Sequence, residues 1–190
     1  SPKAAAPPTL HTLIAAFEAS PKPVVAAIHG TCMGGGLELA LGCHYRVTKP
    51  DAQIALPEVK IGLIPGAGGT QRLPRALGLE AALNMIVSGN VVPAQKLAGT
   101  PLFDEVAEGE LLAAAVTFAE RLIREKRPPK RVRDLKVQHA NPEGFLMFAR
   151  NTVKAVAGPF PAPVKCVEAV TAAASQPFAE GLATEQRLFH

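Results

Sequence analysis

The apolar run Val24-Val25-Ala26-Ala27-Ile28 constrains this chain more than any other feature. An uninterrupted apolar run of this length, bounded by a proline and a glycine, is typical of a strand buried on both faces in a helix-covered sheet. Glycines 34–36 follow, residues 37–43 predict a buried helix, and residues 44–48 predict the next strand. The order strand, helix, strand indicates a right-handed crossover between parallel strands, so we expect an α/β fold.

Helical spacing of apolar residues predicts most of the other elements. Residues 10–17 carry apolar side chains at helical spacing, and residues 111–125 predict an amphipathic helix. The apolar face of this second helix is predicted to carry Leu112, Ala115, Val116, Ala119, Leu122 and Ile123. Further helices are expected over 71–76, 79–88 and 93–97, with a last edge strand over 103–106.

A change in composition divides the chain. Residues 126–142 are rich in Lys, Arg, Pro and Asn, which is typical of a linker. We therefore expect a catalytic core over 1–125, a linker over 126–142 and a helical C-terminal extension over 143–190. Within the extension, helices are predicted over 143–156, 163–174 and 178–189.

Charge and cysteine content exclude several classes of protein. The net charge of +4 arises from 20 Lys and Arg against 16 Asp and Glu, a mild excess that is compatible with an acidic substrate but is not a nucleic-acid footprint. Cys32, Cys43 and Cys166 have no Cys-x-x-Cys spacing, so neither a disulfide framework nor a zinc site is expected, and a reducing cytoplasmic or organelle-matrix setting fits. No signal peptide or membrane span is predicted.

Two glutamates stand in apolar surroundings. Glu38 lies among Leu37, Leu39 and other apolar residues of the predicted buried helix, where lost hydration should raise its pKa. Glu58 follows Pro57 at a predicted strand-to-loop junction, also in apolar company. Two carboxylates in one dry pocket push their pKa values apart, so that one can hold a proton while the other stays charged. The pair is a candidate for general acid and base chemistry.

Glycine-rich turns accompany both glutamates. Glycines that precede a helix expose backbone N–H groups, and such a turn can bind a developing oxyanion, with Gly35 as the candidate donor. The second turn, residues 66–70, lacks the Gly-Lys-Thr/Ser ending of a phosphate-binding loop, and Gln71 stands where a dinucleotide fingerprint needs glycine. We interpret it as a packing and helix-positioning segment.

Each of these interpretations has a plainer alternative. The glycines at 34–36 could form only a tight turn, Glu38 could be a structural acid paired with Arg46, and Glu58 could be a solvated loop residue. His29 and His44 are interpreted as core or supporting residues, and the cysteines as inert small hydrophobic residues.

Four motifs in order and spacing resemble the crotonase (enoyl-CoA hydratase/isomerase) superfamily. These are Lys22 to Gly30, Gly34-Gly35-Gly36-Leu37-Glu38, Leu56-Pro57-Glu58, and Ile64 to Arg72. The resemblance implies a crotonase-like spiral of ββα repeats whose N-terminal strands are missing from this chain, and hydration of trans-2-enoyl-CoA in fatty-acid β-oxidation, with enoyl-CoA isomerisation as a neighbouring activity. It implies Glu38 and Glu58 as catalytic residues and Gly35 as an oxyanion donor.

The resemblance also implies the partners. Coenzyme A enters as part of the acyl-CoA thioester substrate, and no metal or redox cofactor is implied. A second oxyanion donor comes, in the family, from an earlier segment with an Ala-Asp pair, which has no equivalent here. The cytoplasm of a bacterium, or the peroxisomal or mitochondrial matrix, is the expected location.

Residues 161–170 and 178–185 resemble the helical connector of multifunctional β-oxidation enzymes, which leads into an NAD-dependent 3-hydroxyacyl-CoA dehydrogenase. Nothing in the sequence supplies the dinucleotide fingerprint of such a domain. We therefore predict that a dehydrogenase follows His190 in the full-length protein, with the final helices packed back over the hydratase fold. An oligomer is possible.

Two alternatives differ in class. Gly30-Thr31-Cys32-Met33-Gly34 follows a strand and precedes a helix, as a nucleophile elbow with cysteine would in an α/β-hydrolase. Its triad would need a histidine such as His139 or His190, and neither has a suitable setting at a strand end. The non-enzymatic alternative is a catalytically incomplete crotonase-like fragment.

Overall fold

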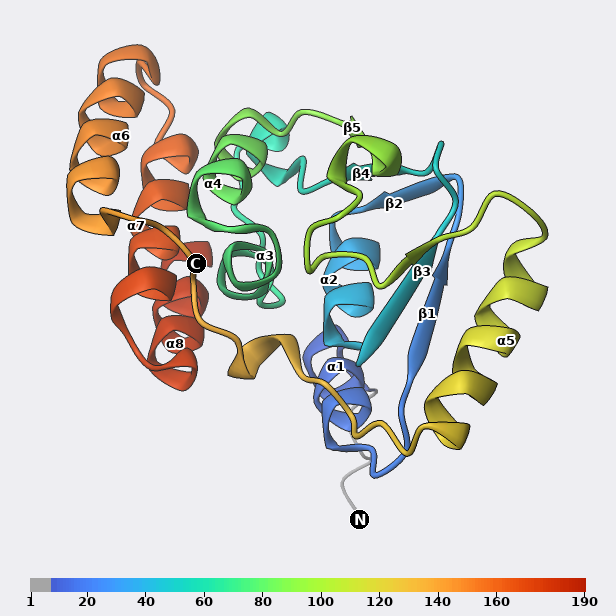
Figure 1. Cartoon of the computed structure of the whole chain (residues 1–190). Coiled ribbons are helices and arrows are strands. Elements are labelled where there is room, and N and C mark those ends of the chain that lie inside the picture. The colour runs from blue at the N-terminus through green and yellow to red at the C-terminus, as the bar shows by residue number, and fades with distance from the viewer. Residues whose placement is uncertain (1–7) are drawn as a thin grey trace, which may run out of the picture.

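A computed structural model describes residues 8–190 of the 190-residue chain. The fold combines two small sheets with helices on both sides, and the α/β prediction is confirmed (Figure 1). That the N-terminal strands of the spiral are missing from this chain stays a prediction. The strands are β1 (Val25–Ile28), β2 (Thr31–Met33), β3 (Tyr45–Thr48), β4 (Gln53–Ala55), β5 (Val92–Pro93) and β6 (Glu105–Val106), and the first five helices are α1 (Leu10–Ala19), α2 (Gly35–Gly42), α3 (Gly69–Leu77), α4 (Leu79–Ser88) and α5 (Leu111–Arg124).

The predicted crossover is present. Strand β1 pairs in parallel with β3, with Val25 opposite Tyr45, and helix α2 lies in the connection between the two strands. The first sheet has the order β1-β3-β6 with every pair parallel, and the second has the order β2-β4-β5 with an antiparallel β4–β5 pair. The predicted strand at 103–106 is confirmed as the edge strand β6.

Strand β1 differs from its prediction. Only Ile28 is buried in this strand, Val25 and Ala26 are half-buried, and Ala27 is exposed. The prediction of burial on both faces is wrong because β1 stands at an edge of its sheet within the described residues. The fully buried strand is instead the central β3, whose polar residues Arg46 and Thr48 are buried with the rest.

Helix α2 packs closely against α1. A Cβ placed on Gly42 would lie 2.7 Å from Ile14 Cγ2, so the two helices approach closely at a position where only a glycine fits without movement. Leu37 and Leu41 are fully buried on the opposite side. This packing fixes the orientation of the helix that carries Glu38.

Helix α5 covers the first sheet with an unexpected face. Its buried residues are Ala115, Phe118 and Leu122, which contact β1 and β3. Leu112 and Ile123 are 68% and 74% exposed, so the predicted apolar face is only partly correct. The aromatic ring of Phe118 lies on the inward side and contacts Tyr45 in a tilted arrangement, with 5.6 Å between ring centroids.

Residues 126–142 run across the molecule as an extended strap with one short 3₁₀ turn, η3 (Val132–Asp134). Val132 is fully buried, Arg133 reaches Glu18, and the hydroxyl of Tyr45 donates a hydrogen bond to the carbonyl of Pro128 at 2.7 Å. The assignment of this segment as a boundary between two units stays a prediction.

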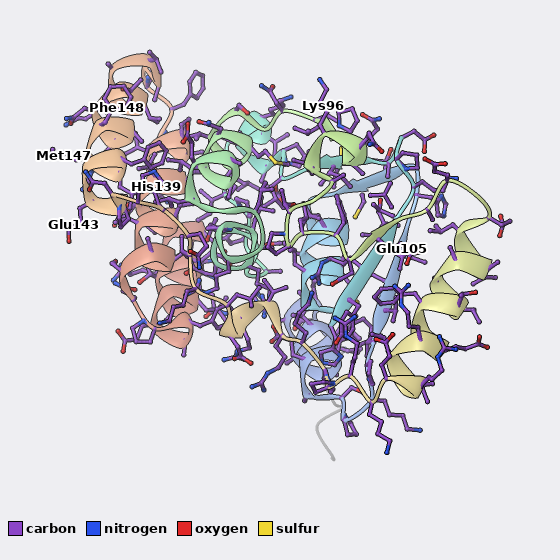
Figure 2. All side chains as sticks on the ribbon, viewed as in Figure 1. Lys96, Glu105, His139, Glu143, Met147 and Phe148 are labelled. Carbon is purple, nitrogen blue, oxygen red and sulfur yellow. The ribbon has the colours of Figure 1, made fainter. Side chains whose placement is uncertain are left out.

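The C-terminal helices pack on the core. They are α6 (Pro142–Val156), α7 (Ala162–Ser175) and α8 (Phe178–Phe189), and α7 contacts α3, α4, α6 and α8. Cys166, Val167 and Val170 of α7 belong to the same apolar cluster as Leu37 and Leu41. Met147 and Phe148 lie on the outer side of α6, away from the strands, and are each 67% exposed (Figure 2). Among residues 8–190, no helix is both long and apolar enough to span a membrane.

Candidate active site

A cavity of about 740 Å³ contains both predicted carboxylates. Its walls come from α1, from the turn before α3 and from the end of α8, three segments that are distant in sequence. The cavity therefore combines residues of the predicted core with residues of the C-terminal extension. Its lining consists of Leu10, His11, Glu38, Glu58, Leu63, Gly66, Ala67, Gln186, Arg187, Phe189 and His190.

Glu38 is held in the floor of this cavity. It lies in the first turn of α2 and is 3% exposed, and its Oε1 accepts hydrogen bonds from the N–H groups of Ala67 at 2.7 Å and Gly69 at 2.8 Å. Burial raises its pKa, while these two N–H groups and the charge of Arg72 act in the opposite direction. The structural alternative of an ion pair with Arg46 is wrong, because the Arg46 guanidinium lies 3.9 Å from Asp104.

Glu58 has a different environment. It begins the short 3₁₀ helix η1 (Glu58–Ile61), is half-buried, and its Oε2 is buried without a hydrogen-bond partner. Burial raises the pKa of Glu58 to about 7, and the negative charge of Glu38 adds to the rise. A carboxyl group in this setting is protonated for a substantial fraction of molecules at neutral pH. The solvated-loop alternative does not describe Glu58.

The turn before α2 lies directly against Glu58. Gly34 has φ +53° and is so close to that carboxylate that a Cβ placed on it would lie 3.1 Å from Glu58 Oε1. Gly35 is the first residue of α2, so its N–H has no acceptor within the helix. The side chain of Leu10 packs on Gly35, at 3.1 Å from an added Cβ, and Gly35 itself is not part of the cavity lining.

The second glycine-rich turn binds two carboxylates. The N–H groups of Gly68 and Thr70 donate to Glu185 at 2.6 Å and 3.0 Å, alternating with the two that bind Glu38. Gly68 has φ +93°, and a side chain there would collide with the guanidinium of Arg72. The interpretation of residues 66–70 as a helix-positioning segment is compatible with this geometry, which also makes the turn an anion-binding segment.

A buried ion pair supports the turn from the other side. Arg72 Nε lies 2.9 Å from Glu18 Oε1, with both side chains almost fully buried, and Arg133 approaches Glu18 at 3.5 Å. Arg72 also donates to the carbonyl of Ala67 at 3.2 Å. The pair therefore connects α1 and the strap to the turn that holds Glu38.

His44 has the supporting role expected of it, whereas His29 is exposed, so its placement as a core residue is wrong. His44 Nδ1 accepts the N–H of Val24 at 2.9 Å, which joins the residue before β3 to the residue before β1. Cys32 lies inside β2 opposite Ile54, and burial raises the pKa of its thiol to about 11, so no nucleophile elbow forms at this position. His139 packs on Phe145, whereas His190 lines the cavity, a placement that its terminal position did not predict.

Sequence reasoning missed Glu185 and the Glu18–Arg72 pair. A signal for Glu185 was present, because Phe178, Gly181 and Glu185 follow helical spacing and are the buried residues of α8. A charged residue at a core position of an amphipathic helix indicates a buried partner. No comparable local signal pairs Glu18 with Arg72, which are 54 residues apart.

Comparison with known proteins agrees with this arrangement. Residues 2–143 match the family model described as Enoyl-CoA hydratase/isomerase. The chain is 41% identical over 182 residues to the peroxisomal bifunctional enzyme of Danio rerio and 38% identical over 182 residues to that of Homo sapiens, in each case over 95% of this chain and 25% of the relative. The chain thus spans a quarter of the length of these curated relatives.

Solved structures of enoyl-CoA hydratases also resemble this chain. An enoyl-CoA hydratase from Bacillus anthracis superposes with a TM-score of 0.58 at 28% identity, over 95% of this chain and 57% of that one. An enoyl-CoA hydratase from Polaromonas sp. JS666 gives a TM-score of 0.56 at 26% identity, over 95% and 58% of the two chains. On the family match over most of its length, this chain belongs to the enoyl-CoA hydratase/isomerase family.

Proposed function

We propose that the chain is the hydratase part of a fatty-acid β-oxidation enzyme and adds water across the double bond of a trans-2-enoyl-CoA thioester. The single observation that carries this proposal is the pair of unlike carboxylates in one cavity. Glu38 accepts two backbone N–H groups, whereas Glu58 has a buried oxygen with no partner. Family membership and the names of the solved neighbours support the same reaction.

The two environments assign the two roles. Burial raises the pKa of Glu38, as a general base near neutral pH needs, and two backbone N–H donors favour its ionised form. Glu38 is therefore the general base, which takes a proton from water as the oxygen attacks the β-carbon. Burial and the negative charge of Glu38 favour the protonated form of Glu58, which delivers its proton to the α-carbon. One hydroxyl and one hydrogen are added, and proton exchange with solvent returns both carboxyls to their starting states.

Charge that develops on the thioester oxygen needs a donor. The N–H of Gly35 at the start of α2 is our candidate, because the helix dipole and the lack of an intrahelical acceptor favour an anion there. Leu10 packs on this glycine on the side where a Cβ would stand. Arg187 on the cavity wall is a positive charge that suits an acidic acyl-CoA.

Substitution of each carboxylate tests the assignment. We expect Glu38→Gln and Glu58→Gln each to lower kcat for crotonyl-CoA hydration by about 100-fold or more. Glu80→Gln is the matched control, because Glu80 is an exposed glutamate on α4, and it should leave turnover unchanged. Retention of turnover within tenfold of wild type by both site variants, a loss of at most about 1.4 kcal/mol of transition-state stabilisation, would exclude the proposed roles.

Isomerisation of a 3-enoyl-CoA is a second candidate activity. Glu58 alone can move a proton between two carbons of the acyl chain, and its unpaired buried oxygen is the observation that favours this. In that case Glu38→Gln should abolish hydration and retain isomerisation, whereas Glu58→Gln should abolish both. Equal loss of the two activities in Glu38→Gln would contradict a separate isomerase role.

We further propose that the chain is joined to a dehydrogenase. The relatives are named bifunctional and peroxisomal, and this chain matches a quarter of their length. A 3-hydroxyacyl-CoA dehydrogenase would oxidise the product of hydration, and a peroxisomal or other reducing compartment suits three free cysteines. The reading frame beyond His190 tests this: a continuation without a strand-turn-helix glycine motif would contradict it.

A further inference from the structure

The turn at residues 67–70 divides its N–H groups between two carboxylates. Ala67 and Gly69 donate to Glu38, and Gly68 and Thr70 donate to Glu185, so consecutive groups point alternately toward α2 and toward α8. The left-handed conformation of Gly68 permits this reversal of direction. One short backbone segment therefore couples the position of Glu38 to the position of Glu185.

Glu185 has few other means of compensating its charge. Its side chain is fully buried, and among residues 8–190 no Lys or Arg forms an ion pair with it. Besides the two N–H groups it accepts the hydroxyl of Thr70, and it lies at the N-terminal end of α3, where the helix dipole favours an anion. If the charge of Glu185 is removed, the N–H groups and the hydroxyl that donate to it lose their charged acceptor.

The charged and titratable groups around this turn come from each element packed on it. Glu38 of α2 lies near Arg72 of α3, His11 of α1 and Glu58 of η1. Glu185 lies near Cys166 of α7. Burial raises the pKa of Glu185 to about 7, and the charge of Glu38 adds to that rise. Because the coupling of two carboxylates is mutual, Glu185 disfavours ionisation of Glu38 in return while Glu185 itself is ionised.

We infer that Glu185 of α8 is a positioning residue for the catalytic base, holding the turn at residues 67–70 so that Glu38 keeps its geometry and its basicity. The inference rests on the proposed role of Glu38. Glu185 does not line the cavity and touches no substrate; it acts through the backbone of the turn. Helix α8 is then a functional part of the acid–base centre, in addition to forming part of its wall.

A carboxylate-to-amide change tests this inference. Glu185→Gln keeps the shape, removes the charge and places an amide donor opposite a backbone N–H. We expect kcat for crotonyl-CoA to fall by about tenfold with KM changed less than about threefold, and the acid limb of the kcat/KM profile to move to lower pH. Glu180→Gln on the exposed side of the same helix is the matched control and should change none of these.

A readout without turnover separates this inference from the hydration proposal. With ¹³C-labelled glutamate, the carboxyl carbon of Glu38 should titrate at lower pH in Glu185→Gln than in wild type. If this shift occurs in a chain that hydrates no enoyl-CoA, the hydration proposal is overturned and the inference about Glu185 stands. A lower melting temperature with an unchanged Glu38 titration would reduce Glu185 to a structural cap and overturn the inference.

A second variant covers loss of folding. If circular dichroism shows that Glu185→Gln is unfolded, Thr70→Val carries the test, because it removes the hydroxyl donor to Glu185 and keeps the carboxylate. The Thr70 hydroxyl also accepts from Gln71 Nε2, which keeps its second acceptor, the Ala169 carbonyl. Its Glu38 titration should move in the same direction by a smaller amount. An unchanged titration in a folded Thr70→Val chain would then overturn the inference.

Discussion

Helix α3 buries polar side chains, whereas helix α5 buries apolar ones. Thr70, Gln71, Arg72 and Arg75 of α3 are all buried. The first three donate to carboxylates and carbonyls of α8, α7 and α1, and Arg75 donates to the Gln71 carbonyl within α3. Helix α5 instead lays one apolar stripe on β1 and β3 and leaves the rest in solvent. Helix α3 therefore supports the candidate active site with polar groups, whereas α5 covers the apolar face of the first sheet.

The largest expected effect lies on the apolar side of this comparison. Phe118→Ala in α5 should lower the free energy of unfolding by about 4 kcal/mol, because the ring is almost fully buried and leaves a cavity. Urea denaturation measures the loss. A loss below about 1 kcal/mol would mean that α5 contributes little to the core, and the comparison would fail.

Removal of one partner of the buried ion pair tests the polar side. Arg72→Met should lower the free energy of unfolding by about 3 kcal/mol, since Glu18 then keeps a buried charge with only Arg133 near it. Arg121→Met in α5 is the matched control: its pair with Glu105 at the end of β6 is about one-third exposed, and its loss should stay below about 1 kcal/mol (Figure 2). Equal losses in the two variants would contradict the difference between the helices.

The pH dependence of stability sharpens the comparison. The pKa of Glu185 is about 7 in the folded state against an ordinary value of 4.5, so the folded chain holds a proton that the unfolded chain has released. Its contribution is therefore fully present below pH 4.5 and is lost as the pH rises to about 7, by about 3 kcal/mol in total. Glu185→Gln should flatten this decline, whereas Glu120→Gln on the exposed side of α5 should not. Denaturation at several pH values distinguishes the variants, and an unaltered slope in Glu185→Gln would refute the buried, proton-binding state.

The smallest effect concerns the outer side of α5. Leu112→Lys should change the free energy of unfolding by less than about 0.5 kcal/mol, because the leucine is 68% exposed. Thermal melting at matched protein concentration measures it. A clear destabilisation would show that this side of the helix is covered in solution.

Local patterns predicted the elements well and their surroundings less well. Helix α4 occurs at the predicted 79–88, because its apolar period and the flanking glycines both lie in the local sequence. The burial of β1 and the inward face of α5 were mispredicted, since both depend on which neighbours a strand or helix meets. Periodicity reports that a face is apolar, but it does not report what covers it.

The same limit applies to the site. Glu38 and Glu58 could be selected from sequence because short motifs surround them, and both lie in the cavity. Glu185 could not be paired with Gly68, from which 117 residues separate it. Its helical spacing with Phe178 and Gly181 predicts burial, yet the identity of the buried partner depends on how α8 docks.

The distance in sequence between Gly68 and Glu185 has a consequence for folding order. Closing a loop of 117 residues carries a conformational entropy cost that nearby contacts do not share, and during synthesis α8 leaves the ribosome after the other helices of residues 8–190. The crossover, α3 and α4 can form from contacts of much shorter range. We therefore expect the turn that binds Glu38 to reach its final geometry last. The sheets and the helices α3 and α4 would then form before the acid–base site is complete.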